Sequence, residues 1–314
     1  MTELAERFTE LRELRARCPE LIAARAAGRK RRPLLGADGR LMIVAADHPA
    51  RGALGVRGEP GAMADRYDLL ARLLTALSRP GVDGLLGTAD IVEDLLLLGA
   101  LEDKVVIGSM NRGGLHGSSF ELDDRFTGYD PATLSSMGLD GGKMLTRIDP
   151  ADPGTVRTLE SAGRAVTELG SRGLVAMLEP FICRRVDGRV VNDLSGQAVI
   201  KSVAIASGLG ATSGYTWLKL PVLDDMTEVM AATTLPVLLL GGDPDGPADQ
   251  AYARWQAALA LPGARGVVVG RTLLYPQDGD VAAAVDAACA LVHSVRGPVR
   301  EARAAMLPGL RSEE

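Results

Sequence analysis

The fold is decided by the stretch LMIVAADHPARGALGVRGEPGAMADRYDLLARLLTALSRPGVDGLLG (41–87). It begins with an apolar run (41–46), passes through a polar, glycine-rich loop, continues with apolar residues at helical spacing (63–79), and ends in a second apolar run (83–87). Short, nearly continuous apolar runs are typical of strands buried on both faces of a parallel sheet. The stretch therefore predicts one strand–helix–strand unit.

The same pattern recurs along the rest of the chain. Further apolar runs occupy 104–108, 142–148, 174–178, 215–220, 236–241 and 266–270, and segments such as 153–173 and 250–260 carry helical spacing between them. Eight strand–helix units over about 250 residues predict a (β/α)8 TIM barrel. An open doubly wound sheet is the rival arrangement, but no Gly-x-Gly-x-x-Gly follows the first strand to mark its nucleotide site.

We expect the chain to divide into three segments. Residues 1–38 are predicted to form an extra N-terminal helix (2–29) and a linker, residues 39–296 the barrel, and residues 297–314 a C-terminal tail. The helix is expected to close the bottom of the barrel or to contact another subunit of a homo-oligomer.

The composition excludes several classes of protein. The chain has 314 residues, 46% hydrophobic residues and a net charge of −5, which is typical of a globular protein with a sizeable core. The acidic balance, the lack of a basic stripe and the 4% aromatic content argue against nucleic-acid binding. No apolar run is long enough to span a bilayer, and the N-terminus does not resemble a signal peptide. Three widely spaced cysteines, Cys18, Cys183 and Cys289, favour a reducing compartment, so we expect a cytoplasmic protein.

Two lysines stand out because the chain has only five among its 35 basic residues. Lys219 lies near the end of the apolar strand YTWLKL, and Lys143 lies in GKMLTRI, two barrel strands earlier. Burying an ammonium group is costly, and alternate strands share layers of the barrel interior, so the two amines are expected to face one another. One amine is then expected to be uncharged near pH 7 and nucleophilic toward a carbonyl. In the alternative, each lysine points outward or forms a buried ion pair.

Two carboxylates are expected at the same barrel mouth. Asp47 closes the first strand and Glu179 closes the run 174–178, and both could pair with Lys143 or carry protons to and from a substrate. In the alternative, each is a helix cap or half of a structural salt bridge. His48 is expected at the rim, whereas His116 and His293 are isolated, and the spacing of the three histidines does not predict a zinc site.

Glycines follow the last two strands. Gly241 and Gly242 come after the run 236–241, and Gly270 is followed by Arg271. In TIM barrels the loops after strands seven and eight often bind phosphate through backbone N–H groups. Because glycine permits close approach and arginine adds a charged fork, these residues predict a phosphorylated or otherwise anionic ligand. The 22-residue loop 109–130, which carries little helical pattern, is expected to be functional or disordered.

The stretches AADHPARGALG, GGKMLTRI, AMLEPF, YTWLKLP, LLLGGD and VVVGR resemble the class I (Schiff-base) aldolases. The resemblance covers residues 40–295 and extends to tagatose-bisphosphate, archaeal-type fructose-bisphosphate, sulfofructose-phosphate and, more distantly, deoxyribose-phosphate aldolases. It implies that the imine-forming lysine is Lys219, accompanied by Lys143, Glu179 and Asp47.

The same resemblance implies a phosphate site and a substrate. Gly241, Gly242, Gly270 and Arg271 correspond to the phosphate-binding loops. His48 and Arg51 are expected to bind the substrate or its phosphate from the loop where relatives carry Asp-Gln-Arg-Gly or Asp-His-Gly. The pattern also resembles an actinobacterial barrel group associated with inositol breakdown, which implies 2-deoxy-5-keto-gluconate 6-phosphate as a substrate.

These observations predict an aldolase that cleaves or forms a C–C bond in a phosphorylated keto sugar or sugar acid, with no metal or organic cofactor. Two other functions remain open. A phosphosugar isomerase or epimerase would use the same barrel without an imine, and a non-catalytic phosphosugar-binding barrel would bind without turnover.

Overall fold

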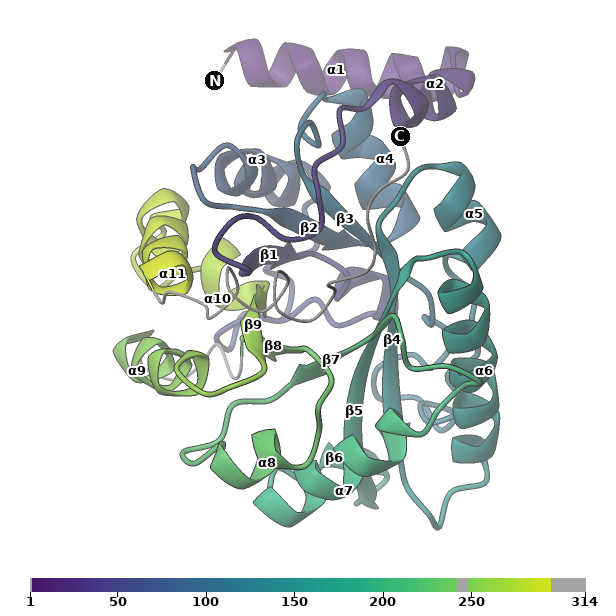
Figure 1. Ribbon diagram of the computed structural model, residues 1–314. Helices are drawn as coiled ribbons and strands as arrows, with labels where there is room; N and C mark the ends of the chain where they lie inside the picture. The colour runs from purple at the N-terminus through teal and green to yellow at the C-terminus, as the bar shows by residue number, and fades with distance from the viewer. Residues whose placement is uncertain (1, 242–247, 295–314) are drawn as a thin grey trace, which may run out of the picture.

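The eight predicted apolar runs form the eight strands of a closed barrel in the computed structural model, which describes residues 2–241 and 248–294 (Figure 1). The strands are parallel and hydrogen-bond in the order β4-β3-β2-β1-β9-β8-β7-β5, and β4 pairs with β5 to close the ring. Closure confirms the predicted TIM barrel and excludes the open doubly wound sheet, which would have two free edges. The barrel strands are β1 (Leu41–Ala45), β2 (Gly84–Gly87), β3 (Val105–Ser109), β4 (Gly141–Ile148), β5 (Val175–Val186), β7 (Thr216–Leu220), β8 (Val237–Leu240) and β9 (Ala264–Val269).

Helices surround the barrel on its outside (Figure 1). The amphipathic segments predicted at 63–79, 153–173 and 250–260 are confirmed as α3, α6 and α9. Asp65 starts α3 by accepting hydrogen bonds from the backbone N–H groups of Tyr67 and Asp68. The helices are α3 (Arg66–Leu77), α4 (Ala89–Leu97), α5 (Pro131–Ser136), α6 (Gly154–Ser171), α7 (Gly196–Ser207), α8 (Thr227–Ala231), α9 (Ala248–Leu259), α10 (Arg271–Leu274) and α11 (Val281–Ser294), with a 3-10 turn η1 (Pro49–Arg51) after β1.

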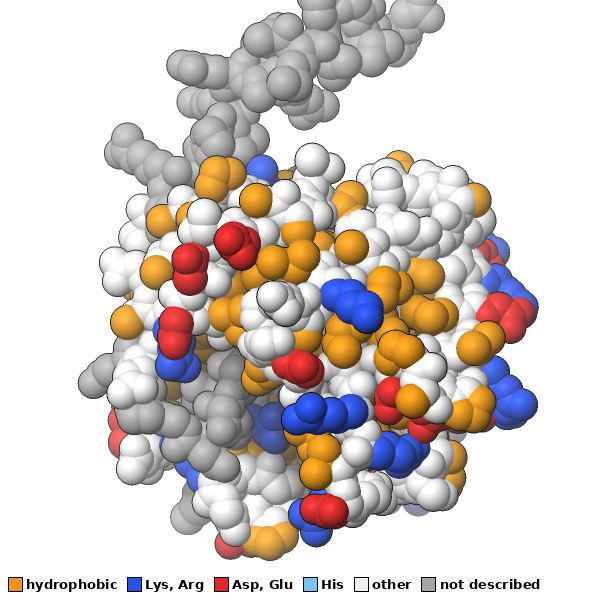
Figure 2. Space-filling view, turned by 90° about the horizontal axis from the view of Figure 1, so that it is seen from below, with side chains coloured by type: hydrophobic (Ala, Val, Ile, Leu, Met, Phe, Trp, Pro, Cys, Tyr) orange, Lys and Arg blue, Asp and Glu red, His pale blue; other side chains and the backbone are white. Residues whose placement is uncertain are grey.

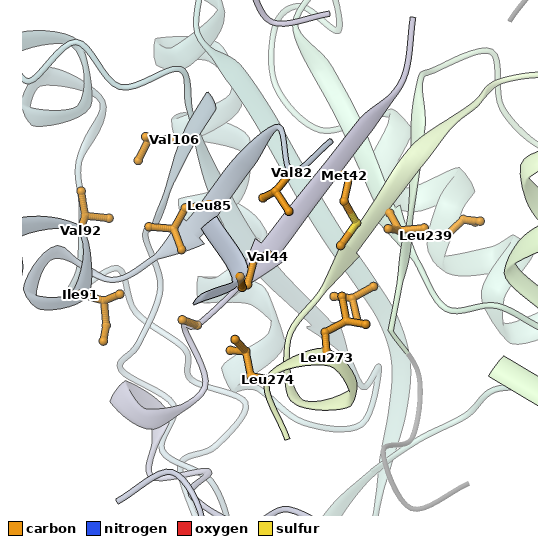
Figure 3. Close-up of a cluster of buried hydrophobic side chains, with 14 of the residues drawn as sticks. Met42, Val44, Val82, Leu85, Ile91, Val92, Val106, Leu239, Leu273 and Leu274 are labelled. Atoms are coloured by element: carbon orange, nitrogen blue, oxygen red, sulfur yellow. The ribbon is translucent and has the colours of Figure 1, made fainter. Parts of the chain in front are cut away.

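Alternate side chains of the barrel strands other than β4 enter two separate apolar cores. On β1, Met42 and Val44 point outward and pack against the surrounding helices (Figure 3). Leu41, Ile43 and Ala45 point into the barrel. The barrel interior is therefore filled with side chains and forms the floor beneath the mouth, as the fold requires.

The N-terminal segment, predicted as one helix, consists of two: α1 (Thr2–Arg17) and α2 (Glu20–Gly28). The helix is interrupted at Pro19. Proline has no backbone N–H to donate, and inside a continuous helix its ring would clash with the carbonyl four residues earlier. Both helices pack against α4, at the top of Figure 1. The predicted homo-oligomer stays a prediction.

The predicted linker is bound to the barrel along its length. Arg29 is buried and donates hydrogen bonds to the carbonyls of Lys104 and Gly138, at 2.6 and 2.9 Å. The next three basic residues pair with carboxylates that flank β2, β3 and β4: Lys30 with Asp103, Arg31 with Asp140, and Arg32 with Asp83. This arrangement covers the bottom of the barrel. Within the described residues, no helix is long and apolar enough to cross a membrane.

A hairpin extends β5 beyond the predicted run 174–178. β5 continues to Val186 and turns back as β6 (Arg189–Asn192) in an antiparallel pair. Asp187 and Gly188 form the turn, both with positive φ, at 49° and 78°. Asp-Gly is a strong signal for such a two-residue turn, so this hairpin was readable from the sequence.

Candidate active site

Two lysines and one glutamate enter the barrel from three strands. Lys219 on β7 points inward because Trp217, two residues earlier, belongs to the barrel interior. Glu179 on β5 also points inward, because Met177, two residues earlier, belongs to the barrel interior. Lys143 on β4 alternates with Met144, which faces the outer core. All three side chains are more than nine-tenths buried and lie directly above the apolar floor.

Glu179 bridges the two lysines. One carboxylate oxygen lies 2.9 Å from Lys219 Nζ, and the other contacts Lys143 Nζ. The outward orientation considered for the lysines is therefore excluded. Both form buried ion pairs, but they share a single carboxylate in the barrel mouth, where TIM-barrel enzymes place their chemistry.

Asp47 extends the row on the far side of Lys143. Its Oδ2 accepts hydrogen bonds from Lys143 Nζ and Ser109 Oγ, both at 3.2 Å, and from the guanidinium of Arg112. Arg112 also donates from Nε to Ser109 Oγ at 2.8 Å. The row therefore alternates in charge: Arg112, Asp47, Lys143, Glu179, Lys219. Sequence reasoning missed Arg112.

Burial and neighbouring charges oppose one another in this row. Burial alone would raise the pKa of Asp47, but the positive charges of Arg112 and Lys143 hold it well below its usual range. Burial would likewise raise the pKa of Glu179, but the positive charges of Lys143 and Lys219 lower it to about 2. Burial lowers the pKa of Lys143, and Asp47 and Glu179 only partly offset this effect. Both carboxylates are therefore ionised at neutral pH.

His48 lies at the edge of this row as a neutral side chain. Burial lowers its pKa to about 3, Asp47 opposes this shift, and the nearby cations Arg271, Lys219 and Lys143 add to it. The side chain is about a quarter exposed (27%), and its buried Nδ1 has no hydrogen-bond partner. In the neutral tautomer that carries its proton on Nδ1, Nε2 can accept a hydrogen bond from a bound molecule.

A cavity of about 780 Å³ opens above the row. Six arginines and two lysines line it, against three carboxylates, although the whole chain is acidic. Figure 2 shows one side of the molecule, where a hollow opens between blue Lys and Arg side chains. The excess of positive charge suits an anionic ligand.

Two of the three predicted glycines lie at this cavity. Gly241 and Gly270 line it with Arg271, and Gly242 is outside the described residues. A Cβ on Gly270 would lie 2.3 Å from the carbonyl oxygen of Ala45, so only glycine lets β9 approach β1 so closely. Among the described residues, Arg271 has no carboxylate partner.

Arg57 is a second cavity arginine without a carboxylate partner in the described part of the chain, and sequence reasoning missed it. It lies in a two-residue turn with Gly58, at a positive φ of 52°, and its Nε donates to the carbonyl of Tyr275 at 3.1 Å. Both central residues of such a two-residue turn have positive φ, so the turn accounts for the backbone of Arg57, and the residue lines the cavity. The signal in the sequence was Arg-Gly within the long loop after the first strand.

Arg51, predicted to bind substrate, is held by protein groups. It is buried, it contacts Asp124 and the carbonyl of Gly114, and it donates to the carbonyl of Asn111 at 2.9 Å. Its role in binding substrate stays a prediction.

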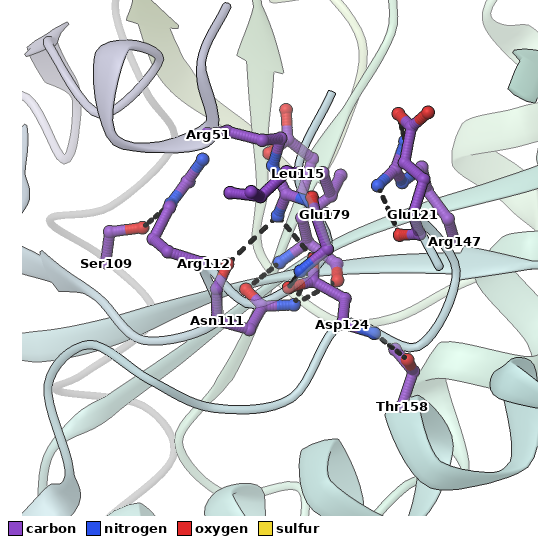
Figure 4. Close-up of polar contacts among 12 residues, drawn as sticks. Arg51, Ser109, Asn111, Arg112, Leu115, Glu121, Asp124, Arg147, Thr158 and Glu179 are labelled. Carbon is purple, nitrogen blue, oxygen red and sulfur yellow. Dashed lines mark hydrogen bonds and ion pairs between the residues drawn. The ribbon is translucent and has the colours of Figure 1, made fainter. Parts of the chain in front are cut away.

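The loop 109–130 is anchored to the barrel mouth by buried polar contacts. The side chain of Asn111 accepts from the backbone N–H of Leu145 at 2.9 Å and donates to Asp124. Arg147 pairs with Glu121 in the same loop. Figure 4 shows Arg112 directed toward Ser109 and Arg147 toward Glu121. The loop therefore forms a fixed wall of the cavity.

Within the described ranges, no three His, Cys, Asp or Glu side chains are grouped so that they could hold a metal ion.

The Cgl0159-like family matches residues 39–289. The crystal structure of Cgl0159 from Corynebacterium glutamicum has 59% sequence identity and a TM-score of 0.90, and the alignment covers 92% of this chain and 97% of that one. A search of curated proteins found no match.

Solved aldolases share the fold at low identity. An archaeal fructose 1,6-bisphosphate aldolase has 19% identity and a TM-score of 0.59, over 83% of this chain and 97% of that one. A second archaeal fructose-1,6-bisphosphate aldolase structure, with its catalytic lysine bound to the carbinolamine intermediate, has 20% identity and a TM-score of 0.58, over 83% and 96%. At this identity the likeness concerns the fold.

Proposed function

This chain belongs to the Cgl0159-like family, and we propose that it is a class I aldolase acting on a phosphorylated keto sugar or sugar acid. The observation that carries the proposal is the buried Glu179 carboxylate between two lysine amines at the floor of a positively charged cavity. Such a group combines a nucleophile for a carbonyl with a charged partner that can move protons.

Lys219 is the nucleophile in the proposed reaction. Its amine gives up a proton and attacks the substrate carbonyl to form a carbinolamine, and loss of water leaves a cationic iminium. A base then removes the proton of the hydroxyl on the carbon beyond the scissile bond. The C–C bond breaks, its electron pair moves to the iminium nitrogen, and an aldehyde leaves. Protonation of the enamine and hydrolysis release the second product and restore the amine.

The number of ion pairs distinguishes the two lysines. Lys143 contacts two carboxylates, Asp47 and Glu179, whereas in the described part of the chain Lys219 pairs with Glu179 alone. Two ion pairs fix the position of Lys143, whereas Lys219, with one, retains more freedom to rotate toward a substrate.

Glu179 and Asp47 have different tasks. Glu179 lies 2.9 Å from Lys219 Nζ, so it can accept the amine proton and return protons to the substrate oxygen, directly or through water. Asp47 is held ionised by Arg112 and Lys143, so it serves as a hydrogen-bond acceptor that orients a substrate hydroxyl or the carbinolamine.

The phosphate of the substrate is proposed to bind beside Gly241, Gly242, Gly270 and Arg271. Support comes from the described glycines at the cavity, from the excess of cavity cations, and from Arg57 and Arg271, which have guanidinium groups available to an anion. His48 is proposed to accept a substrate hydroxyl. Within this class, 2-deoxy-5-keto-gluconate 6-phosphate is the proposed substrate. The shared fold with enzymes described as Schiff-base-forming fructose-1,6-bisphosphate aldolases supports the reaction type.

A screen of phosphorylated keto sugars and sugar acids tests the proposal. We expect release of a C3 phosphate, either dihydroxyacetone phosphate or glyceraldehyde phosphate, or of malonate semialdehyde in the case of the sugar acid. Lys219→Ala should abolish release, whereas Lys201→Ala, at an exposed lysine on α7, should not change it. Activity that survives Lys219→Arg would favour an isomerase or epimerase, and binding without turnover would favour a phosphosugar-binding barrel.

A further inference from the structure

The row at the barrel floor has one positive charge too many. Arg112, Lys143 and Lys219 supply three cations, and Asp47 and Glu179 supply two anions. All five side chains are at least nine-tenths buried, so solvent screens this imbalance poorly. The row becomes neutral when one amine loses its proton.

Other charged groups near the row do not remove the imbalance. Glu59, the third carboxylate of the cavity, is exposed to solvent and forms no ion pair with any of the five residues. His48 follows Asp47 and is neutral at pH 7, and Arg271 at the start of α10 adds positive charge. The two neighbouring pairs, Arg51 with Asp124 and Arg147 with Glu121, are each balanced internally.

We propose that Arg112 is the positioning residue that leaves one lysine amine of this row uncharged at neutral pH. Arg112 contacts Asp47 and binds Ser109, and so fixes the end of the row opposite Lys219. The positive charge of Arg112 already neutralises Asp47. Glu179 is therefore the one remaining negative charge for the two lysine amines. Arg112 acts through these neighbours and does not itself react.

The inference rests on the proposed function, because it accounts for the uncharged amine that Schiff-base chemistry needs. Its test uses no sugar substrate. Pentane-2,4-dione serves as the probe. A free amine adds to one of its carbonyls, water leaves, and the imine shifts to a vinylogous amide that absorbs in the near ultraviolet. The rate is measured from pH 5 to 10, and peptide mass spectrometry identifies the modified lysine.

The wild type, Arg112→Met, Asp47→Asn and the double variant are compared, because the two substitutions change the net charge of the row in opposite directions. Arg112→Met leaves two cations and two anions, so both amines keep their protons, and the pH midpoint of the reaction should rise by about one unit, a tenfold slower reaction at pH 7. Asp47→Asn leaves three cations and one anion and should lower the midpoint. The double variant restores one excess positive charge, and its midpoint should return to within about 0.3 units of the wild type. Arg112→Lys, which keeps the charge, should stay equally close.

The sign of each shift decides the matter. A midpoint unchanged in Arg112→Met, or shifted in the same direction in both single variants, would overturn the inference. If Arg112→Met does not fold, Asp47→Asn alone still tests it, because a midpoint that does not fall contradicts the charge count. If the midpoints shift as expected but no sugar is cleaved, the proposed aldolase function fails and the role of Arg112 stands.

Discussion

Replacing Glu179 by glutamine should destabilise the protein strongly at neutral pH. The substitution keeps the shape of the side chain but removes the negative charge that contacts Lys143 and lies 2.9 Å from Lys219 Nζ. Breaking a buried ion pair from one side costs about 3–5 kcal/mol, because the remaining charge stays buried without a partner.

The pKa of Glu179 gives a consistent magnitude. Its pKa falls from 4.5 to about 2 on folding, and each unit corresponds to about 1.4 kcal/mol, so ionised Glu179 contributes about 3 kcal/mol to stability. A lowered pKa means that this contribution is fully present above pH 4.5 and is lost as the pH falls from 4.5 toward 2.

Urea unfolding at pH 7 and pH 9.5 measures the effect. We expect Glu179→Gln to lose about 3 kcal/mol of unfolding free energy at pH 7 and less at pH 9.5, where the amine that is still protonated at pH 7 can also lose its proton. Glu121→Gln, which leaves Arg147 without its carboxylate but touches neither lysine, is the matched control and should not show the recovery. A loss below about 1 kcal/mol at pH 7 would refute the bridging role of Glu179.

Three further predictions concern other parts of the molecule. Asp83 and Asp38 raise the pKa of His293 from 6.5 to about 9. The contribution of His293 to stability is therefore fully present below pH 6.5 and is lost as the pH rises through 9. The difference in unfolding free energy between wild type and His293→Gln, measured in urea, should shrink between pH 6 and pH 10. Gly270→Ala places a Cβ 2.3 Å from the carbonyl oxygen of Ala45, so we expect a loss of about 2 kcal/mol and a lower melting temperature, whereas an unchanged melting curve would show that β9 can shift freely. Arg271→Ala should raise KM for a phosphorylated substrate about 10- to 100-fold through the loss of a charge-assisted contact of about 1.5–3 kcal/mol, with little change in kcat; equal KM values would separate Arg271 from the anion site.

The sequence was most informative where a residue type conflicted with its surroundings. Lys143, Lys219 and Glu179 could be identified because charged groups in apolar barrel strands must find partners, and the strand alternation placed all three inside. The barrel itself followed from the repeated apolar runs, which depend only on local periodicity.

Arg112 could not be identified in this way. Arginine is the ordinary cation of this chain, the loop after β3 has no periodicity, and its partner Asp47 lies 65 positions away in the sequence. Only the folded chain brings the two together. The β5–β6 hairpin is a different case, since Asp187-Gly188 between alternating apolar residues was a local signal that strand counting overlooked.

The most direct test of the central claim is borohydride reduction of the enzyme during turnover, followed by peptide mass spectrometry. The account predicts one substrate fragment, reduced onto Lys219 and absent from Lys219→Ala. An adduct on Lys143 would reverse the roles of the two lysines, and turnover without any adduct would contradict the Schiff-base reaction.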